Sequence, residues 1–175
     1  MIQGDNAMQQ ERFLKAYDQF ADGVFRYGIV KLSNRDAALD LTQDTFMRYW
    51  NHLRRGGAVE HEQAFIFTIA RRLVIDRYRA KRTTSLDQLR ENNGFEPVDG
   101  HTTSPEEAAD AHRAMALVNR LPQEYRDVLT LRYIEGLGPR DIASVTNLSA
   151  NVVSVRLHRG IAKLRALMHT HHDND

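Results

Sequence analysis

The 175-residue sequence contains no cysteine, which excludes disulfide bonds and thiolate metal sites. It has no apolar run long enough to cross a bilayer, and its first residues, MIQGDNAMQQER, lack the order of a signal peptide. The formal net charge is only +1, which argues against indiscriminate nucleic-acid binding through bulk charge. These absences favour a soluble protein of the cytoplasm, without membrane insertion.

The residue patterns of an active site are missing as well. There is no nucleophile beside a base, no pair of carboxylates in an apolar setting and no glycine-rich phosphate loop. His169, His171 and His172 could bind a metal, but no neighbouring group would orient them. We therefore expect no enzyme activity, no cofactor and no metal.

Charge is arranged in blocks along the chain. Basic residues gather in 48–55, 71–82 and 156–165, whereas acidic residues gather between 87 and 110. Separated blocks of opposite sign indicate two basic surfaces and an acidic connector.

Apolar residues recur at three- and four-residue spacing and rarely alternate, which predicts helices almost throughout. The expected helices cover residues 10–32, 36–54, 62–81, from 104 onward, from 122 to the EGLG at 135–138, and within 139–168. Ser33 or Asn34 should cap the second helix, and the tail HTHHDND should fray. Residues 83–103 lose the periodicity and have linker composition. We predict an all-α fold: two small helical domains, 1–82 (three to four helices) and 105–175, joined by a flexible acidic linker, 83–104.

The segment from Pro139 has the anatomy of a helix-turn-helix. A short helix leads through TNL to a second helix that Ser149 should cap, with Val153 and Leu157 on its buried face. Residues near the start of such a helix reach base edges in the major groove, where arginine can bond guanine and asparagine adenine. The candidate contacts are Asn151, Ser154, Val155, Arg156, His158 and Arg159. A merely solvated helix pair is the alternative.

Aromatic and basic residues share the helix predicted over 62–81. Ile66, Ile69 and Leu73 define a packing face, and a second stripe lies nearly opposite. That stripe contains Phe67, Arg71, Val74, Tyr78 and Arg82. Rings can stack on unpaired bases while guanidinium groups hold phosphates. Alternatively, the rings complete a second packing surface under the arginines.

The helix predicted over 36–54 combines a core stripe with an acidic row. The core stripe is Leu39, Phe46, Trp50 and Leu53, and the row is Asp36, Asp40, Gln43 and Asp44. The order DLTQDTF…W, a loop, then FxxxIARRLxxDxxR resembles the extracytoplasmic-function (ECF) class of bacterial sigma factors. The C-terminal part of the sequence resembles the second domain of that class through LPxxxRxVLxLRY, the helix-turn-helix and VRLHRGxxKLR.

The resemblance implies sigma region 2 in the first domain and sigma region 4 in the second. Asp40, Gln43, Asp44 and Phe46 would dock on the β′ clamp helices of core RNA polymerase, and the β flap is a further expected partner. The loop RGGAVEHE and the following helix would recognise and melt the minus-ten element and capture a flipped base. The residues implied there are Phe67, Arg71, Arg72, Tyr78, Arg79 and Arg82. The helix from Ser149 would read the minus-thirty-five element as duplex, and an anti-sigma factor would control the protein.

Several positions depart from the family pattern. Arg72 stands where asparagine is common, Phe65 where tryptophan is frequent, and Ser154 and Val155 where a more polar pair is usual. The alternative function is a stand-alone helix-turn-helix regulator, which would need a ligand pocket or an apolar dimer face but no long acidic linker.

Overall fold

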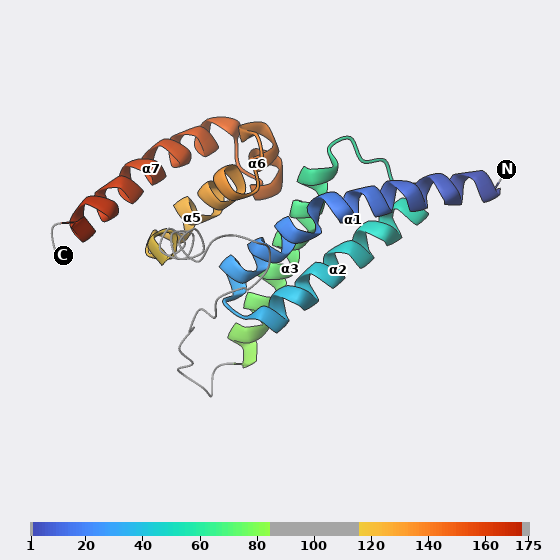
Figure 1. The fold of residues 1–175 in the computed structure, drawn as a ribbon, viewed down its shortest axis with the longest axis horizontal. Helices are drawn as coiled ribbons and strands as arrows, with labels where there is room; N and C mark the ends of the chain where they lie inside the picture. Colours follow the sequence, from blue (N-terminus) through green and yellow to red (C-terminus); the bar gives the residue numbers. More distant parts are fainter. Residues whose placement is uncertain (1, 85–115, 173–175) are drawn as a thin grey trace. The chain divides into compact units, whose positions relative to one another are not determined.

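The computed structural model describes the backbone of residues 2–84 and 116–172 and the side chains within 7–80 and 116–168. The chain forms two compact units, Met1–Glu96 and Pro97–Asp175. Unit 1 contains α1 (Ile2–Leu32), α2 (Arg35–Arg54) and α3 (Glu62–Thr84). Unit 2 contains α5 (Gln123–Leu129), the π-helix η1 (Thr130–Ile134), α6 (Pro139–Thr146) and α7 (Ala150–His172). The described residues form helices and no strand, which confirms the all-α prediction (Figure 1). The start of the helix predicted from Ser104 and most of the predicted linker lie outside the described residues.

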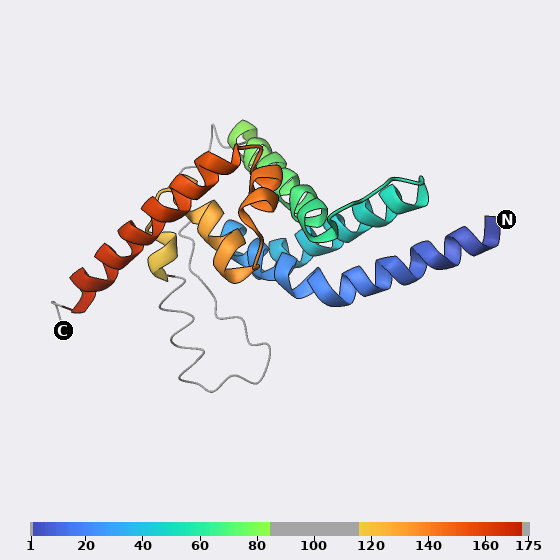
Figure 2. The same ribbon diagram turned by 90° about the horizontal axis from the view of Figure 1, so that it is seen from above.

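Helices α1 and α2 form an antiparallel hairpin, and α3 packs against both (Figures 1 and 2). The turn needs only Ser33, in the left-handed region at φ 51°, and Asn34. The Asn34 side chain accepts a hydrogen bond from the Ala37 amide at 2.8 Å, so Asn34 is the predicted cap. Near the turn, Gly28 lets the helices approach closely: a Cβ on it would lie 3.0 Å from the Ala38 Cα.

Replacing Gly28 by leucine should therefore destabilise unit 1. The added side chain would enter space that the backbone of α2 occupies, and overpacking of this kind costs about 1–3 kcal/mol of unfolding free energy. Urea unfolding followed by circular dichroism measures the change. Wild-type stability of Gly28→Leu would contradict the close helix approach.

Aromatic rings fill the space between α1 and α2 toward the far end of the hairpin. Phe13 lies 5.2 Å from Trp50 between ring centroids, and Tyr17 lies 4.8 Å from Phe46. Leu39, which the periodicity assigns to the core, is instead 44% exposed. That prediction is wrong because Leu39 lies at the open edge of the helix pair, while Ala38 and Leu41 face inward at 0% exposure.

Unit 2 is built around α5 and the helix-turn-helix. Gly160 of α7 packs on α5, where a Cβ would lie 3.1 Å from Leu129 Cδ1. Asn147 ends α6 in the left-handed region at φ 58°, and the predicted cap Ser149 accepts from the Val152 amide at 3.3 Å. Two details differ from prediction. The helix from Pro122 ends in a π-turn, closed by the Glu135 amide on the Thr130 carbonyl, and α7 continues to His172, four residues into the predicted tail, whose last three residues lie outside the described part of the chain.

Candidate nucleic-acid and protein interfaces

The acidic row of α2 lies on the surface of unit 1. Its members, Asp36, Asp40, Gln43 and Asp44, are all exposed. Phe46, assigned with them to a polymerase contact, is 2% exposed and packs against the Tyr17 ring. A direct contact through Phe46 is therefore wrong, because its ring is enclosed by the helix pair and supports the row from within.

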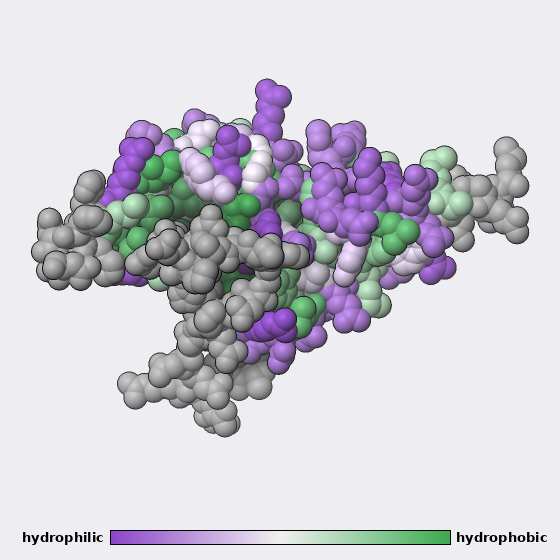
Figure 3. All heavy atoms as spheres, in the orientation of Figure 1, coloured by the Kyte–Doolittle hydropathy of each residue, from purple (hydrophilic) through white to green (hydrophobic). Residues whose placement is uncertain are grey.

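An apolar groove of about 780 Å³ runs between α1 and α2 beside this row. Four of its side chains are large and exposed: Leu14 at 52%, Tyr17 at 45%, Leu39 at 44% and Met47 at 56%. Gln43 also lines the groove. Hydrophobic residues interrupt the hydrophilic surface over α1 and α2 in Figure 3. An exposed apolar groove with an acidic edge has the composition of a protein-docking surface and would repel phosphate.

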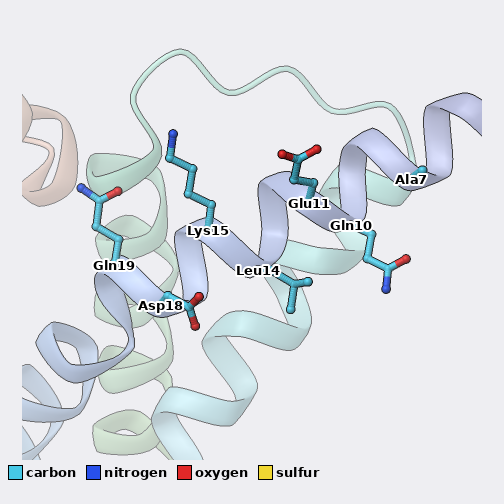
Figure 4. Close-up of a pocket in the computed structure, with 7 residues that line it drawn as sticks. All are labelled: Ala7, Gln10, Glu11, Leu14, Lys15, Asp18 and Gln19. Carbon is cyan, nitrogen blue, oxygen red and sulfur yellow. The ribbon is translucent and has the colours of Figure 1, made fainter.

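A second hollow, of about 660 Å³, is lined by α1 alone (Figure 4). Glu11 and Lys15 point to the side of α1 along which the α2–α3 loop runs, whereas Gln10 and Leu14 point toward α2. Because one helix provides the whole lining, this hollow is open and offers no converging polar groups. Gln10 and Leu14 belong to the α1–α2 groove as well.

Arg77 connects α3 to the acidic row, a role that the sequence patterns do not indicate. Its Nη1 donates to the Ala37 carbonyl at 2.6 Å, and its Nη2 lies 3.3 Å from Asp44 Oδ2. The Asp44 side chain is 51% exposed, so this ion pair is screened by water and adds little stability. It does hold Asp44 on the α3 side of the row.

Phe67 is not available for stacking on bases. It is 1% exposed and meets the Tyr27 ring edge-on, at 5.8 Å between centroids and 88° between planes. Val74, on the same predicted stripe, is also buried at 4% exposure. The predicted DNA contact through Phe67 is wrong because α3 packs against both α1 and α2, so its buried arc includes both stripes.

The rest of the predicted minus-ten set forms a basic surface on the outer side of α3. Arg72 and Arg79 are exposed, Arg71 is half-buried, and the Tyr78 ring is 48% exposed. The Tyr78 hydroxyl donates to the Lys31 carbonyl, which fixes the ring at the end of α1. Arg82 lies in the last turns of α3, beyond the described side chains. The exposed part of this surface offers one anchored ring and the exposed arginines Arg72 and Arg79 on the same helix.

A hydrogen-bonded network holds the α2–α3 loop, residues 55–61, against α1. Arg12 Nε donates to the Glu62 carboxylate, and Arg12 Nη2 donates to the Val59 carbonyl at 2.7 Å. The Tyr49 hydroxyl donates to the same Glu62 oxygen at 2.9 Å. The Glu62 hydrogen bond raises the pKa of the Arg12 guanidinium, and burial raises the pKa of the Tyr49 hydroxyl. Arginine and tyrosine carry their protons at neutral pH in any case, so both donate to Glu62 there, and the loop is fixed at its C-terminal end.

The outer face of α7 carries most of the predicted duplex contacts. Asn151, Ser154, Val155, His158 and Arg159 are all exposed. Arg156 is half-buried and lies 3.6 Å from Glu124 of α5, and the Ser154 hydroxyl donates to the Ala150 carbonyl at 3.0 Å. These two side chains are thus engaged within the protein. Val152, which the sequence reasoning missed, is 38% exposed beside them.

The missed residues differ in the signals that could have revealed them. Val152 is one position before the buried Val153, about 100° around the helix from it, so a helical wheel places it off the buried face. Arg77 follows the buried Leu73 and Val74 by four and three positions, which places it on the same side of α3, but this spacing does not indicate its partner on α2. The Arg12–Glu62 pair joins positions 50 apart and has no local signal.

Within the described residues, no group of three or more potential metal ligands is present, and no helix is long and apolar enough to span a membrane. His169, His171 and His172 belong to the last turns of α7, where side chains are not described. The metal and membrane patterns therefore add no further candidate site to the described part of the chain.

Comparison with known proteins agrees with two functional units. The family model for sigma-70 region 2 matches residues 12–84, and that for sigma-70 region 4 matches residues 111–164. Among solved structures, the sigma factor RpoE bound to the anti-sigma factor NepR, from Bartonella quintana, has a TM-score of 0.71 at 20% identity. The match covers 90% of this chain and 97% of the RpoE chain. CnrH, bound to the cytosolic domain of CnrY, has a TM-score of 0.68 at 23% identity. The match covers 95% of this chain and 96% of the CnrH chain. At these identities the likeness shows that the two structures share this chain's fold, and no more.

Region 2 followed by region 4 defines a sigma factor of the sigma-70 family, and this chain belongs to that family. It is similar to the ECF RNA polymerase sigma factor BldN of Streptomyces coelicolor, at 28% identity, over 96% of this chain and 64% of BldN. It is similar also to the ECF sigma factor SigL of Mycobacterium tuberculosis, at 26% identity, over 94% of this chain and 93% of SigL. Both relatives carry the ECF designation, which confirms the predicted resemblance to that class.

Proposed function

We propose that this sigma factor binds core RNA polymerase in the cytoplasm and directs it to specific promoters, while the polymerase supplies all the chemistry. Unit 1 docks on the enzyme and opens the minus-ten element, and unit 2 reads the minus-thirty-five element as duplex. The observation that carries the proposal is the exposed acidic row of α2. A protein that only bound DNA would gain nothing from acids beside an apolar groove, because they repel phosphate.

Docking uses the acidic row together with the neighbouring groove. Asp40 and Gln43 supply polar contacts, and the exposed Leu39 and Met47 supply apolar area. A helical partner with apolar and basic side chains fits such a surface, since apolar burial gives affinity and opposite charge gives a fast, specific encounter. The β′ clamp helices are the proposed partner, and the β flap contacts unit 2.

Strand opening uses the outer side of α3 and the fixed α2–α3 loop. The exposed part of the Tyr78 ring accepts an unpaired base, and Arg72 and Arg79 lie on the same helix to hold phosphates. The Arg12–Glu62 network keeps the loop in place for the captured base. Phe67 contributes only through the core.

An anti-sigma factor controls the protein by covering the groove and the acidic row. A partner seated there would hide exposed apolar side chains and exclude the polymerase from the same surface. Competition for one surface is a sufficient mechanism, and it needs no change in the fold.

Promoter binding should depend on polymerase, and this dependence tests the proposal. Two elements about two turns apart are separated by ~70 Å, at ~34–36 Å per turn. The linker predicted over residues 83–104 would span only ~25 Å on average if it behaves as a flexible chain. Free protein should therefore bind a full promoter little better than its upstream element alone, because the second contact gains little effective concentration.

Fluorescence anisotropy with the spacer changed by one or two base pairs measures this dependence. Core polymerase should create a strong preference for one spacer length, because it anchors both units. Co-purification with core polymerase is the companion experiment. Tight, spacing-sensitive binding by the free protein, without capture of polymerase, would support the stand-alone regulator instead.

A further inference from the structure

Two valines on the outer face of α7 are partly exposed. Val152 is 38% exposed and Val155 is 40% exposed. The buried face of α7 is occupied by others: Val153 is 0% exposed, and Gly160 packs on α5. Val152 and Val155 instead line a hollow of about 200 Å³, whose other lining residues are Asn151, Arg156 and Arg159 of α7 and Glu124 and Tyr125 of α5.

Two polar side chains beside the valines, Ser154 and Arg156, have partners within the protein. The Ser154 hydroxyl bonds the Ala150 carbonyl, and Arg156 pairs with Glu124. The exposed side chains of the first turns of α7 include Asn151 and these two valines. A valine in a helix has one strongly preferred rotamer, so its methyl groups are held in place and lose little entropy on contact.

Duplex DNA offers these methyl groups one matching partner. The major groove presents a single apolar group, the C5 methyl of thymine. Residues three apart on a helix are ~4.5 Å apart along its axis, and base pairs are ~3.4 Å apart, so Val152 and Val155 reach the same or adjacent pairs. Arg159, an exposed basic side chain on the same helix, suits a flanking phosphate.

We propose that Val152 and Val155 recognise thymine methyl groups in the minus-thirty-five duplex, next to an adenine contact by Asn151. The element read by this protein accordingly contains one or two thymines whose methyl groups set part of its sequence preference. The inference deepens the proposed function and rests on it, because it requires α7 to lie in the major groove. Single exposed valines are common on protein surfaces, so the experiment must isolate the methyl contact.

Deoxyuridine substitution isolates that contact, because deoxyuridine differs from thymidine only by the missing methyl group. Holoenzyme reconstituted with core polymerase first selects an upstream element from a randomised duplex library. Each thymine of that element is then replaced singly by deoxyuridine, and binding of the full chain is measured by fluorescence anisotropy. Wild-type binding should weaken about three- to fivefold at one or two positions, as expected for one buried methyl group.

The valine variants complete a double-mutant cycle. Val155→Ala and Val152→Ala should each bind the thymine duplex about three- to fivefold more weakly and should lose the sensitivity to deoxyuridine at one position. Arg159→Ala is the comparison: it should weaken binding yet keep the full deoxyuridine sensitivity. Circular dichroism confirms that the variants remain folded.

The outcomes separate this inference from the proposed function. If binding to the selected element is unaffected by deoxyuridine at every thymine, the valine contact is wrong while duplex reading stands. Undiminished deoxyuridine sensitivity in both valine variants would likewise overturn the valine contact alone. If holoenzyme selects no duplex element at all, the proposed function fails and the inference fails with it.

Discussion

Replacing Phe67 by alanine should lower the free energy of unfolding of unit 1 by about 3–5 kcal/mol, the cost of truncating a buried phenylalanine. The ring is 1% exposed and meets Tyr27 edge-on, so its removal leaves a cavity between α3 and α1 and forfeits an aromatic contact. Because native domains are stable by only about 5–15 kcal/mol, much of unit 1 should be unfolded at moderate temperature. Thermal and urea unfolding of the full chain, followed by circular dichroism, measure this loss.

Tyr78→Ala is the matched comparison on the same helix. Its ring is 48% exposed, so the variant should lose much less stability than Phe67→Ala while impairing strand opening by about 1–3 kcal/mol per lost stack. Permanganate footprinting of the open complex on a weak promoter reads out this second effect. A folded Phe67→Ala protein with selective loss of strand opening would restore the role in base stacking that its burial contradicts.

The fold was predictable because its determinants are local. Apolar spacing, the Asn34 cap and the helix-turn-helix pattern each act within a few residues, and the structure has helices where they indicate. The number of neighbours of each helix is not a local property. Because α3 contacts both α1 and α2, Phe67 and Val74 are buried together with Ile66 and Leu73, although a single-stripe interpretation places them outside.

The candidate site was predictable in the same way: its local features were, and its contacts between elements were not. The exposed face of α7 follows from one helix and its cap, and the structure exposes nearly all of it. The contacts that connect elements, Arg77 with Asp44 and Arg12 with Glu62, join residues 33 and 50 positions apart. No local pattern encodes such pairs, because they depend on how the helices cross.

Reversing the charge of the acidic row should have the largest effect on function. Asp40→Lys combined with Asp44→Lys should weaken binding to core polymerase by on the order of 100-fold, because like charges across an interface cost several kcal/mol. Both side chains are exposed, so the fold should be retained. Loss of the Asp44–Arg77 ion pair should change stability by no more than about 1 kcal/mol, as is usual for an exposed pair. Anisotropy of labelled protein, titrated with core polymerase at two salt concentrations, measures the affinity.

Two control variants show whether the effect belongs to the row. Glu11→Lys makes the same charge change on the side of α1 along which the loop runs, away from the groove, and should bind core polymerase like wild type (Figure 4). Arg77→Met removes the ion pair but leaves the row acidic, so it should also retain polymerase binding. Part of the loss in the double variant should appear in the association rate and should shrink at high salt, because charges at an interface rim act mainly by steering. Unchanged affinity of the folded double variant at low salt would show that the acidic row is not part of the polymerase interface. Only the apolar groove would then remain as a candidate docking surface.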